Sequence, residues 1–481
     1  MIAGVQPEST RPSRHPAREV WTQAWPTVLT MVSYTLMQFV DSLMVSKVGA
    51  LEVAAVGNGG IWAFAPQSFL FGFLSVVNTF VAQNVGAGRR EGAARYGWAG
   101  LWLGVASWVV VMLPWALMLP WFFAWMGHSP QLQRMELQYG LVLAYGSIAG
   151  LVGKSMSNFF FGLQRPRVIT IAAILGNVTN VLLNYVLIYG SDGLPSWGLP
   201  GVWFVPPLGV LGAAIATVCG TVVEAALPLG LFLFGRLSRE LRVRESWRPR
   251  VHELIELVRL GWPVSIQFGN EIICWAIFMT VLVGQFGEMH LTAGWSTLRY
   301  MHLSFMPAVG FSVATTALVG KYIGAGKPDV AANRAHWAVG MATVYMSACG
   351  LCMALFRGPL IGVFVSDADP AVASEVIAIG SRLMVCAAIF QTFDAVGIAY
   401  TGALRGAGDT LVPGIATIVL SWGVIVGLGA WLVSAHPALS STGPWIAASA
   451  YIILYGAVVA WRFERGAWRQ IRLLEPTPAA V

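Results

Sequence analysis

Three carboxylic acids, Asp41, Glu271 and Asp394, lie in otherwise apolar stretches of this chain, and none has a basic residue within one helical turn. A charge is costly inside a lipid bilayer, so an acid there is a functional hypothesis by default. A carboxylate without a basic partner in a low dielectric either takes up a proton or holds a cation. The three acids therefore predict coupling to a gradient of H⁺ or Na⁺. The alternative is a structural polar contact between packed helices.

Amide side chains provide a second chemical signal. Asn177, Asn180 and Asn184 are spaced i, i+3 and i+7, which places them on one helical face. Amides are costly against lipid, so this face is expected to point into the protein. The amide oxygens of Asn180 and Asn184 could lie beside a carboxylate and form a proton relay or a sodium cage. The alternative is that these amides only form hydrogen bonds between helices.

Other residues predict features around such a site. Arg299 and His302, at i and i+3, are candidates to pair with an acid of the second half. Pro26 lies 15 residues before Asp41 and predicts a bend there, or else only marks a helix start. Lys154, Glu224 and Arg382 are further candidates for intramembrane charges, or for side chains that extend toward an interface.

Composition shows what kind of elements position these residues. The chain is 57% hydrophobic and 11% charged, against roughly a quarter charged in soluble domains. Apolar stretches of the ~20 residues needed to cross a bilayer recur along it. They predict an all-α polytopic membrane protein with twelve transmembrane helices, at 20–47, 54–84, 97–126, 135–163, 167–190, 207–235, 254–285, 291–321, 331–364, 375–403, 410–434 and 444–463.

Basic residues alternate between the loops. Most of the 29 Lys and Arg fall in the even-numbered connections and at the termini. The fifth connection has none, and the ninth is acidic from Ser366 to Pro370. By the positive-inside rule, both termini and the even connections are expected to face the cytoplasm. The polar N-terminus has no apolar signal region, so the first apolar stretch is expected to remain as a helix.

The sequence repeats itself at a spacing of about 238 residues. Trp25-Pro26 returns as Trp262-Pro263, Gly86-Ala87-Gly88 as Gly324-Ala325-Gly326, and Gly162-x-x-Arg165 as Gly402-x-x-Arg405. Duplicated halves in so apolar a chain predict a transporter with its binding site between them. The expected division is an N-terminal tail (1–19), a first lobe (20–235), a basic linker (236–253), a second lobe (254–463) and a C-terminal tail (464–481). With six helices each, the two lobes are parallel repeats around a central cleft, and the linker is expected to be solvated near anionic lipid.

In this setting the chain resembles the MATE (multidrug and toxic compound extrusion) family over about residues 20–465. The resemblance rests on an ordered set of short stretches rather than on any single motif. They are Trp25-Pro26, Phe39–Asp41, Val85–Arg90, Asn180–Gly190, Gly209–Thr217, Gly310–Ala314, Gly324–Lys327 and Gly402–Thr410.

The resemblance implies a secondary active antiporter that exports organic, mostly cationic compounds in exchange for H⁺ or Na⁺ by alternating access. The family's cation site in the first lobe matches Asp41, Asn180 and Asn184, with Thr217. The site that other members carry in the second lobe matches Glu271 and Asp394. Those members have a tyrosine one turn before that aspartate, and here it is Phe390, which argues against a sodium cage of that form. The expected cavity-lining residues are Gln38, Arg299, His302 and Phe390, and the expected hinge is Pro26.

Three rival functions predict different residues. A major-facilitator transporter should have an Asp in the loop after the second helix, where this chain has Gly86–Glu91. A lipid-linked precursor flippase of the same superfamily would favour a basic cavity, whereas the deep charges here lean acidic. A membrane-embedded enzyme would need a nucleophile or metal set, and neither His-x-x-x-His nor Gly-x-Ser-x-Gly occurs.

The remaining expectations concern partners and location. Cys349-x-x-Cys352 has no second pair, so no metal site and no cofactor are expected beyond the coupling ion, H⁺ or Na⁺. We expect small organic cations or drugs as substrates, contact with membrane lipids, no nucleic acid and a monomer. The expected location is the inner membrane of the cell.

Overall fold

The structure is a computed structural model that describes residues 15–194, 198, 200–365 and 369–474. Within these residues, twelve helical spans are long and apolar enough to cross a membrane. They confirm the predicted all-helical fold. Residues 1–14 and 475–481 of the predicted tails lie outside the described residues. So do residues 366–368 of the ninth connection, which include the acidic Asp367.

The first six spans contain eight main helices. They are α1 (Pro16–Ser46), α2 (Ala50–Ser75), α3 (Val77–Gly86), α4 (Arg90–Ser107), α5 (Leu113–Trp125), α6 (Pro130–Gly162), α7 (Pro166–Asn184) and α8 (Gly209–Leu233). Wide π-type turns continue two of these spans, at Trp108–Met112 and Tyr185–Tyr189, and a 3₁₀ turn follows at Gly190–Asp192.

The second half repeats this arrangement. After the short α9 (Arg236–Glu240) come α10 (Val251–Ile277), α11 (Glu288–Gly324), α12 (Pro328–Leu355), α13 (Arg357–Gly362), α14 (Pro370–Ala407), α15 (Leu411–Leu420), α16 (Gly429–Ala435) and α17 (Thr442–Glu464). The π-type turns lie at Phe278–Val283 and Ser421–Leu428, and 3₁₀ turns lie at Val243–Glu245, Gly284–Phe286, Pro437–Leu439 and Ala467–Gln470.

The ninth span is shorter than predicted. It ends at Leu355 rather than at residue 364, and α13 follows as a separate helix. Pro359 explains the break, because it has no backbone N–H to donate to the carbonyl of Leu355 and its ring crowds the preceding turn. Elsewhere proline starts helices, at the first position of α1, α6, α7, α12 and α14, where its fixed φ suits the first turn.

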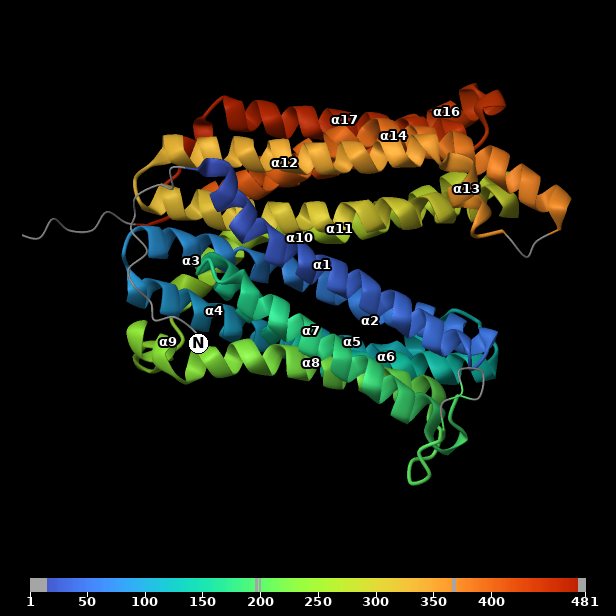
Figure 1. The fold of residues 1–481 in the computed structure, drawn as a ribbon, viewed down its shortest axis with the longest axis horizontal. Coiled ribbons are helices and arrows are strands. Elements are labelled where there is room, and N and C mark those ends of the chain that lie inside the picture. The colour runs from blue at the N-terminus through green and yellow to red at the C-terminus, as the bar shows by residue number, and fades with distance from the viewer. Residues whose placement is uncertain (1–14, 195–197, 199, 366–368, 475–481) are drawn as a thin grey trace, which may run out of the picture.

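The helices gather into two bundles, one from each half of the chain (Figure 1). In the first, α6 packs on α2 and α8, and α7 packs on α8; in the second, α14 packs on α11, α12 and α17. Helix α1 crosses obliquely from the first bundle toward the second and contacts α11 and α12. The two halves found in the sequence are therefore two packed structural units.

We call one end of the molecule the basic end. It holds the connections 87–89, 163–165, 234–250, 325–327 and 408–410. Side chains of α3 hydrogen-bond across the two bundles near this end, from Thr79 Oγ1 to the Arg405 carbonyl (2.9 Å) and from Gln83 Nε2 to the Gly406 carbonyl (3.0 Å). The two halves are thus joined through helix ends at the basic end.

The basic linker packs against α4, while its six arginines remain exposed. Trp98 and Trp102 of α4 donate their indole N–H groups to the carbonyls of Val243 (2.8 Å) and Trp247 (2.9 Å). Val243 is fully buried in the apolar core of the first half. These contacts hold the linker against α4, because its apolar side chains Leu241 and Val243 and its backbone carbonyls find partners there.

Candidate functional site

Helices α1 and α7 run parallel and meet along a polar seam. Thr170 donates to the Pro26 carbonyl (2.8 Å), Asn177 to the Ser33 carbonyl (2.9 Å), and Asn184 to a carboxylate oxygen of Asp41 (2.5 Å). The three α7 residues follow one another at intervals of seven, the repeat that keeps one helix face against a parallel neighbour. The face predicted from the asparagine spacing therefore does point into the protein, against α1.

The far end of this seam carries the first-half acid. Asn184 Nδ2 also donates to Asn180 Oδ1 (3.2 Å). Asn180 Nδ2 in turn donates to Thr217 Oγ1 of α8, over a longer distance of 3.4 Å. Asn180 and Asn184 are buried, whereas Asp41 is half-buried. The structure thus brings together the four residues predicted for the first lobe.

One atom of this cluster lacks a partner. The side-chain oxygen of Asn184 is buried and accepts no hydrogen bond from the described residues. A buried acceptor without a donor is costly unless a ligand completes it. With the oxygens of Asp41, Asn180 and Thr217 nearby, the cluster has the hard oxygen donors that a small cation requires, and its single carboxylate can equally hold a proton.

Tyr139 of α6 is part of this site, although the sequence did not reveal it. Its side chain is buried, contacts Thr217 and interacts electrostatically with Asp41. A lone tyrosine in an apolar helix usually indicates core packing or an interface anchor. The signal that the sequence offered was its spacing of three residues from Glu136, which places both on one helix face.

Gln38 and Pro26 lie on the same helix as Asp41. Gln38 is exposed, one turn from Asp41 toward the basic end. Pro26 is buried, and its carbonyl accepts from the hydroxyls of both Thr30 (2.9 Å) and Thr170 (2.8 Å). Helix α1 runs unbroken from Pro16 to Ser46, and the hinge at Pro26 stays a prediction.

The second-half acids lie together on α10 and α14. Glu271 and Asp394 are both half-buried and interact electrostatically with each other. Their basic neighbour is Arg405, which interacts with Glu271 and lies 6.0 Å from the Phe268 ring centre. Arg405 lies beyond the predicted end of its span at residue 403, but it belongs to the last turn of α14. Its Nε atom is buried without a hydrogen-bond acceptor among the described residues.

The other predicted second-half residues have different surroundings. Arg299 is exposed and lies 5.8 Å from the Phe364 ring centre, and His302 is exposed beside Phe305. Their pairing with the acids stays a prediction. Phe390 is fully buried in the apolar core, so in this conformation it packs the second bundle instead of lining a cavity.

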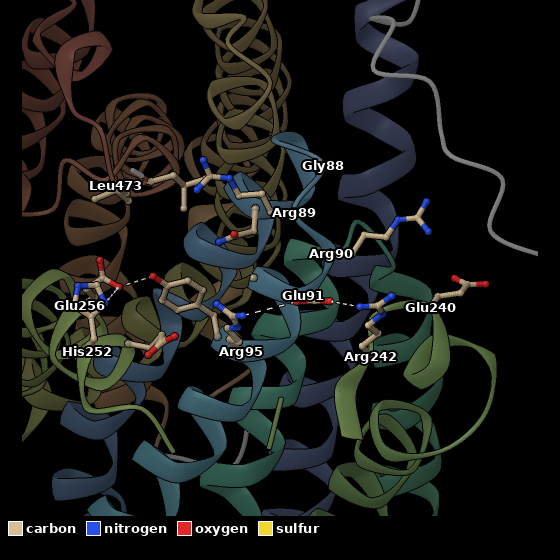
Figure 2. Close-up of a pocket in the computed structure, with 15 residues that line it drawn as sticks. Gly88, Arg89, Arg90, Glu91, Arg95, Glu240, Arg242, His252, Glu256 and Leu473 are labelled. Atoms are coloured by element: carbon tan, nitrogen blue, oxygen red, sulfur yellow. Dashed lines mark hydrogen bonds and ion pairs between the residues drawn. The ribbon is translucent and has the colours of Figure 1, made fainter. Parts of the chain in front are cut away.

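A separate cavity of about 740 Å³ opens at the basic end, between the start of α4, the linker and α10 (Figure 2). Its charges are largely paired, since Glu91 lies 2.7 Å from Arg242 and 3.8 Å from Arg95. Tyr96 donates a hydrogen bond to Glu256, beside which His252 lies at 3.3 Å. Partly exposed pairs of this kind stabilise little. The predicted coupling residues do not line this cavity.

Comparison with known proteins identifies the family. The model of the MatE family matches residues 26–186 and, again, residues 271–431. The chain belongs to the MATE family. The double match covers both repeats, and because the family is one of transporters, the enzyme alternative is excluded.

Individual relatives agree with this placement. The multidrug resistance protein NorM of Burkholderia vietnamiensis is 30% identical over 94% of this chain and 94% of its own length. Among solved structures, a MATE protein in complex with MaL6 superposes with a TM-score of 0.85 at 21% identity, covering 98% of this chain and 100% of that one. An outward-facing multidrug resistance MATE transporter gives 0.82 at 21% identity, with coverages of 95% and 97%. The chain is thus a multi-pass membrane protein with the MATE fold.

Proposed function

We propose that this protein is a secondary active multidrug efflux antiporter, which exports organic, mostly cationic compounds in exchange for H⁺ or Na⁺ by alternating access. Its relatives named as multidrug resistance proteins support this function. The observation that carries the proposal is the cluster of Asp41, Asn180, Asn184 and Thr217, in which the Asn184 amide of α7 donates to the Asp41 carboxylate of α1 while its own buried oxygen accepts no hydrogen bond from the described residues.

The way in which the two halves are joined supports alternating access. The bundles, which we assign to residues 20–235 and 254–463, meet through α1, α3, α10 and α11. Hydrogen bonds from Thr79 and Gln83 close the basic end. Breaking those contacts while new ones form at the far end would move a central site from one side of the membrane to the other.

We further propose that the basic end faces the cytoplasm of a cell with an inner membrane, with both termini on that side. The support is the positive-inside rule, since the linker alone carries six arginines between Arg236 and Arg250. We propose that the protein works as a monomer. Its exposed tryptophans, such as Trp121, Trp125 and Trp203, contact lipid or the membrane–water interface.

Transport by purified protein in liposomes tests this function. Tetraphenylphosphonium serves as the organic cation, with sodium and proton gradients imposed separately. We expect extrusion driven by at least one of the two gradients, and none in liposomes containing Asp41→Asn. Wild-type protein that moves no organic cation under either gradient would refute the proposal.

A further inference from the structure

A polar cluster around one carboxylate, Glu224, lies inside the first half, away from Asp41. Tyr34 of α1 donates a hydrogen bond from its hydroxyl to the carboxylate of Glu224 on α8. Lys154 of α6 lies 5.2 Å from the Phe71 ring centre and interacts electrostatically with Glu224. All these groups belong to membrane-spanning helices, where an ionisable residue is rarely kept without a function.

This cluster repeats the register of the Asp41 site. Glu224 follows Thr217 by seven residues on α8, and Tyr34 precedes Asp41 by seven residues on α1. Seven residues are two helical turns, a rise of about 10.5 Å. Because α1 starts at the basic end and α8 ends there, both displacements point the same way. Glu224 therefore lies about two turns nearer the basic end than the Asp41 site.

Polar side chains occupy the space between the two levels. Thr221 lies between Thr217 and Glu224 on α8, and its hydroxyl donates to the Thr217 carbonyl (2.8 Å). Gln38 lies between Tyr34 and Asp41 on α1 and is exposed. A hydroxyl and an exposed amide thus lie between the levels of the Asp41 and Glu224 carboxylates.

The surroundings of Glu224 select the cation that it can bind. Helix α1 presents the Tyr34 hydroxyl, α6 presents the Lys154 ammonium, and α7 presents Gly176, where an added Cβ would lie 2.9 Å from the Glu224 Cβ. Lys154 also interacts electrostatically with Arg405 of the second half. The described contacts of Glu224 offer a sodium ion few oxygens besides the Tyr34 hydroxyl, whereas a proton needs only the carboxylate.

We propose that Glu224 is a second proton-binding carboxylate, which accepts the coupling proton from Asp41 and passes it to the basic end. The inference rests on the proposed antiport. In the transfer, the O–H bond of protonated Asp41 breaks and an O–H bond forms on Glu224, with Thr221 and water carrying the proton between them. Asp41 is left as a carboxylate. Glu224 then gives its proton to water at the basic end, and its restored charge is stabilised by Lys154.

Two assays on the same liposomes test this role. Net efflux of tetraphenylphosphonium driven by a pH gradient requires proton release at the basic end. Exchange of labelled for unlabelled tetraphenylphosphonium without any gradient requires only reorientation of the substrate-loaded protein. We expect Glu224→Gln to lose net efflux and to keep wild-type exchange. Glu375→Gln, the same change at an exposed site, should retain both.

Every other result decides against the proposal. Normal net efflux in Glu224→Gln would exclude Glu224 from the proton path, and equal loss of both activities would show a structural role. If that variant does not fold, Tyr34→Phe removes only the hydroxyl, and we expect it to slow net efflux more than exchange; an equal effect overturns the proposal. Wild-type protein that exchanges the cation but responds only to sodium would refute the proton relay while leaving efflux intact.

Discussion

Gly86 and Gly324, equivalent residues of the two repeats, each face the backbone of the other repeat at the basic end. A Cβ on Gly86 would lie 1.9 Å from the Lys321 carbonyl oxygen, and one on Gly324 would lie 2.0 Å from the Gln83 carbonyl oxygen. The Gly-Ala-Gly motif therefore recurs because the ends of α3 and α11 touch where the two halves join.

This contact predicts that Gly324→Ala destabilises the closed basic end. The methyl group has no room, so the helix ends must separate, at a cost of roughly 1–3 kcal/mol. We expect a lower melting temperature and a reduced rate of net efflux. Gly340→Ala on the neighbouring α12 is the matched control, since its Cβ would meet no atom within 4 Å. Equal melting temperatures for the two variants would contradict the prediction.

A buried ion pair also closes the basic end. Arg334 of α12 donates from Nε to Glu19 of α1 (2.8 Å), and Tyr322 of α11 donates to the same carboxylate (2.5 Å). The side chains of Arg334 and Glu19 are only 5% and 15% exposed. This pair ties the first helix of one half to two helices of the other.

We predict that Glu19→Gln favours opening at the basic end. Replacing the carboxylate by a neutral amide removes its charge from the buried pair with Arg334, at a cost of roughly 3 kcal/mol. Spin labels at Arg90 and Arg465, exposed residues of the two halves, should show a longer distance in the variant. Asp329→Asn, which removes an exposed pair with Arg469, should leave the distance unchanged. The idea fails if Glu19→Gln gives the wild-type distance distribution.

The sequence predicted most of the fold and the first-half site, for identifiable reasons. Apolar length determines the spans, and the spacing of Asn180 and Asn184 shows which face turns inward, so their contact with Asp41 could be expected. Arg405 was harder to assign, because its position near a helix end resembled a loop charge. Yet it follows Asp394 by eleven residues, about three turns, and so shares its face. The burial of Phe390 depends on tertiary packing that no local spacing reports.

Asp41→Asn should abolish gradient-driven export while leaving the fold intact. The amide is nearly isosteric with the carboxylate, but it can neither bind a proton nor neutralise a cation. We expect wild-type melting behaviour and no net efflux. Asp192→Asn, an exposed acid outside the site, serves as the control and should transport normally. Cells that express Asp41→Asn at the wild-type level and keep full drug resistance would contradict this role.

The final prediction concerns the coupling ion. Asp41 is the one carboxylate of its cluster, and its hydrogen-bond partner Asn184 is neutral. A proton can bind such an acid alone, whereas sodium needs several oxygens at once. Asn180, Asn184 and Thr217 offer such oxygens, and the buried Asn184 oxygen accepts no hydrogen bond from the described residues. Because Phe390 removes a hydroxyl from the second-half alternative, we favour the proton, with Asp41 as its carrier.

Export should therefore persist in sodium-free buffer under a pH gradient. The variant Asn184→Leu distinguishes proton coupling from sodium coupling, because it removes the amide oxygen and leaves the carboxylic acid of Asp41. Under proton coupling, this variant should keep pH-driven efflux, with a changed rate but no sodium requirement. Under sodium coupling, it should lose efflux entirely, because the cation would be left with too few ligands. If sodium-free vesicles show no export at any pH gradient and added sodium restores it, Asp41, Asn180, Asn184 and Thr217 are sodium ligands instead.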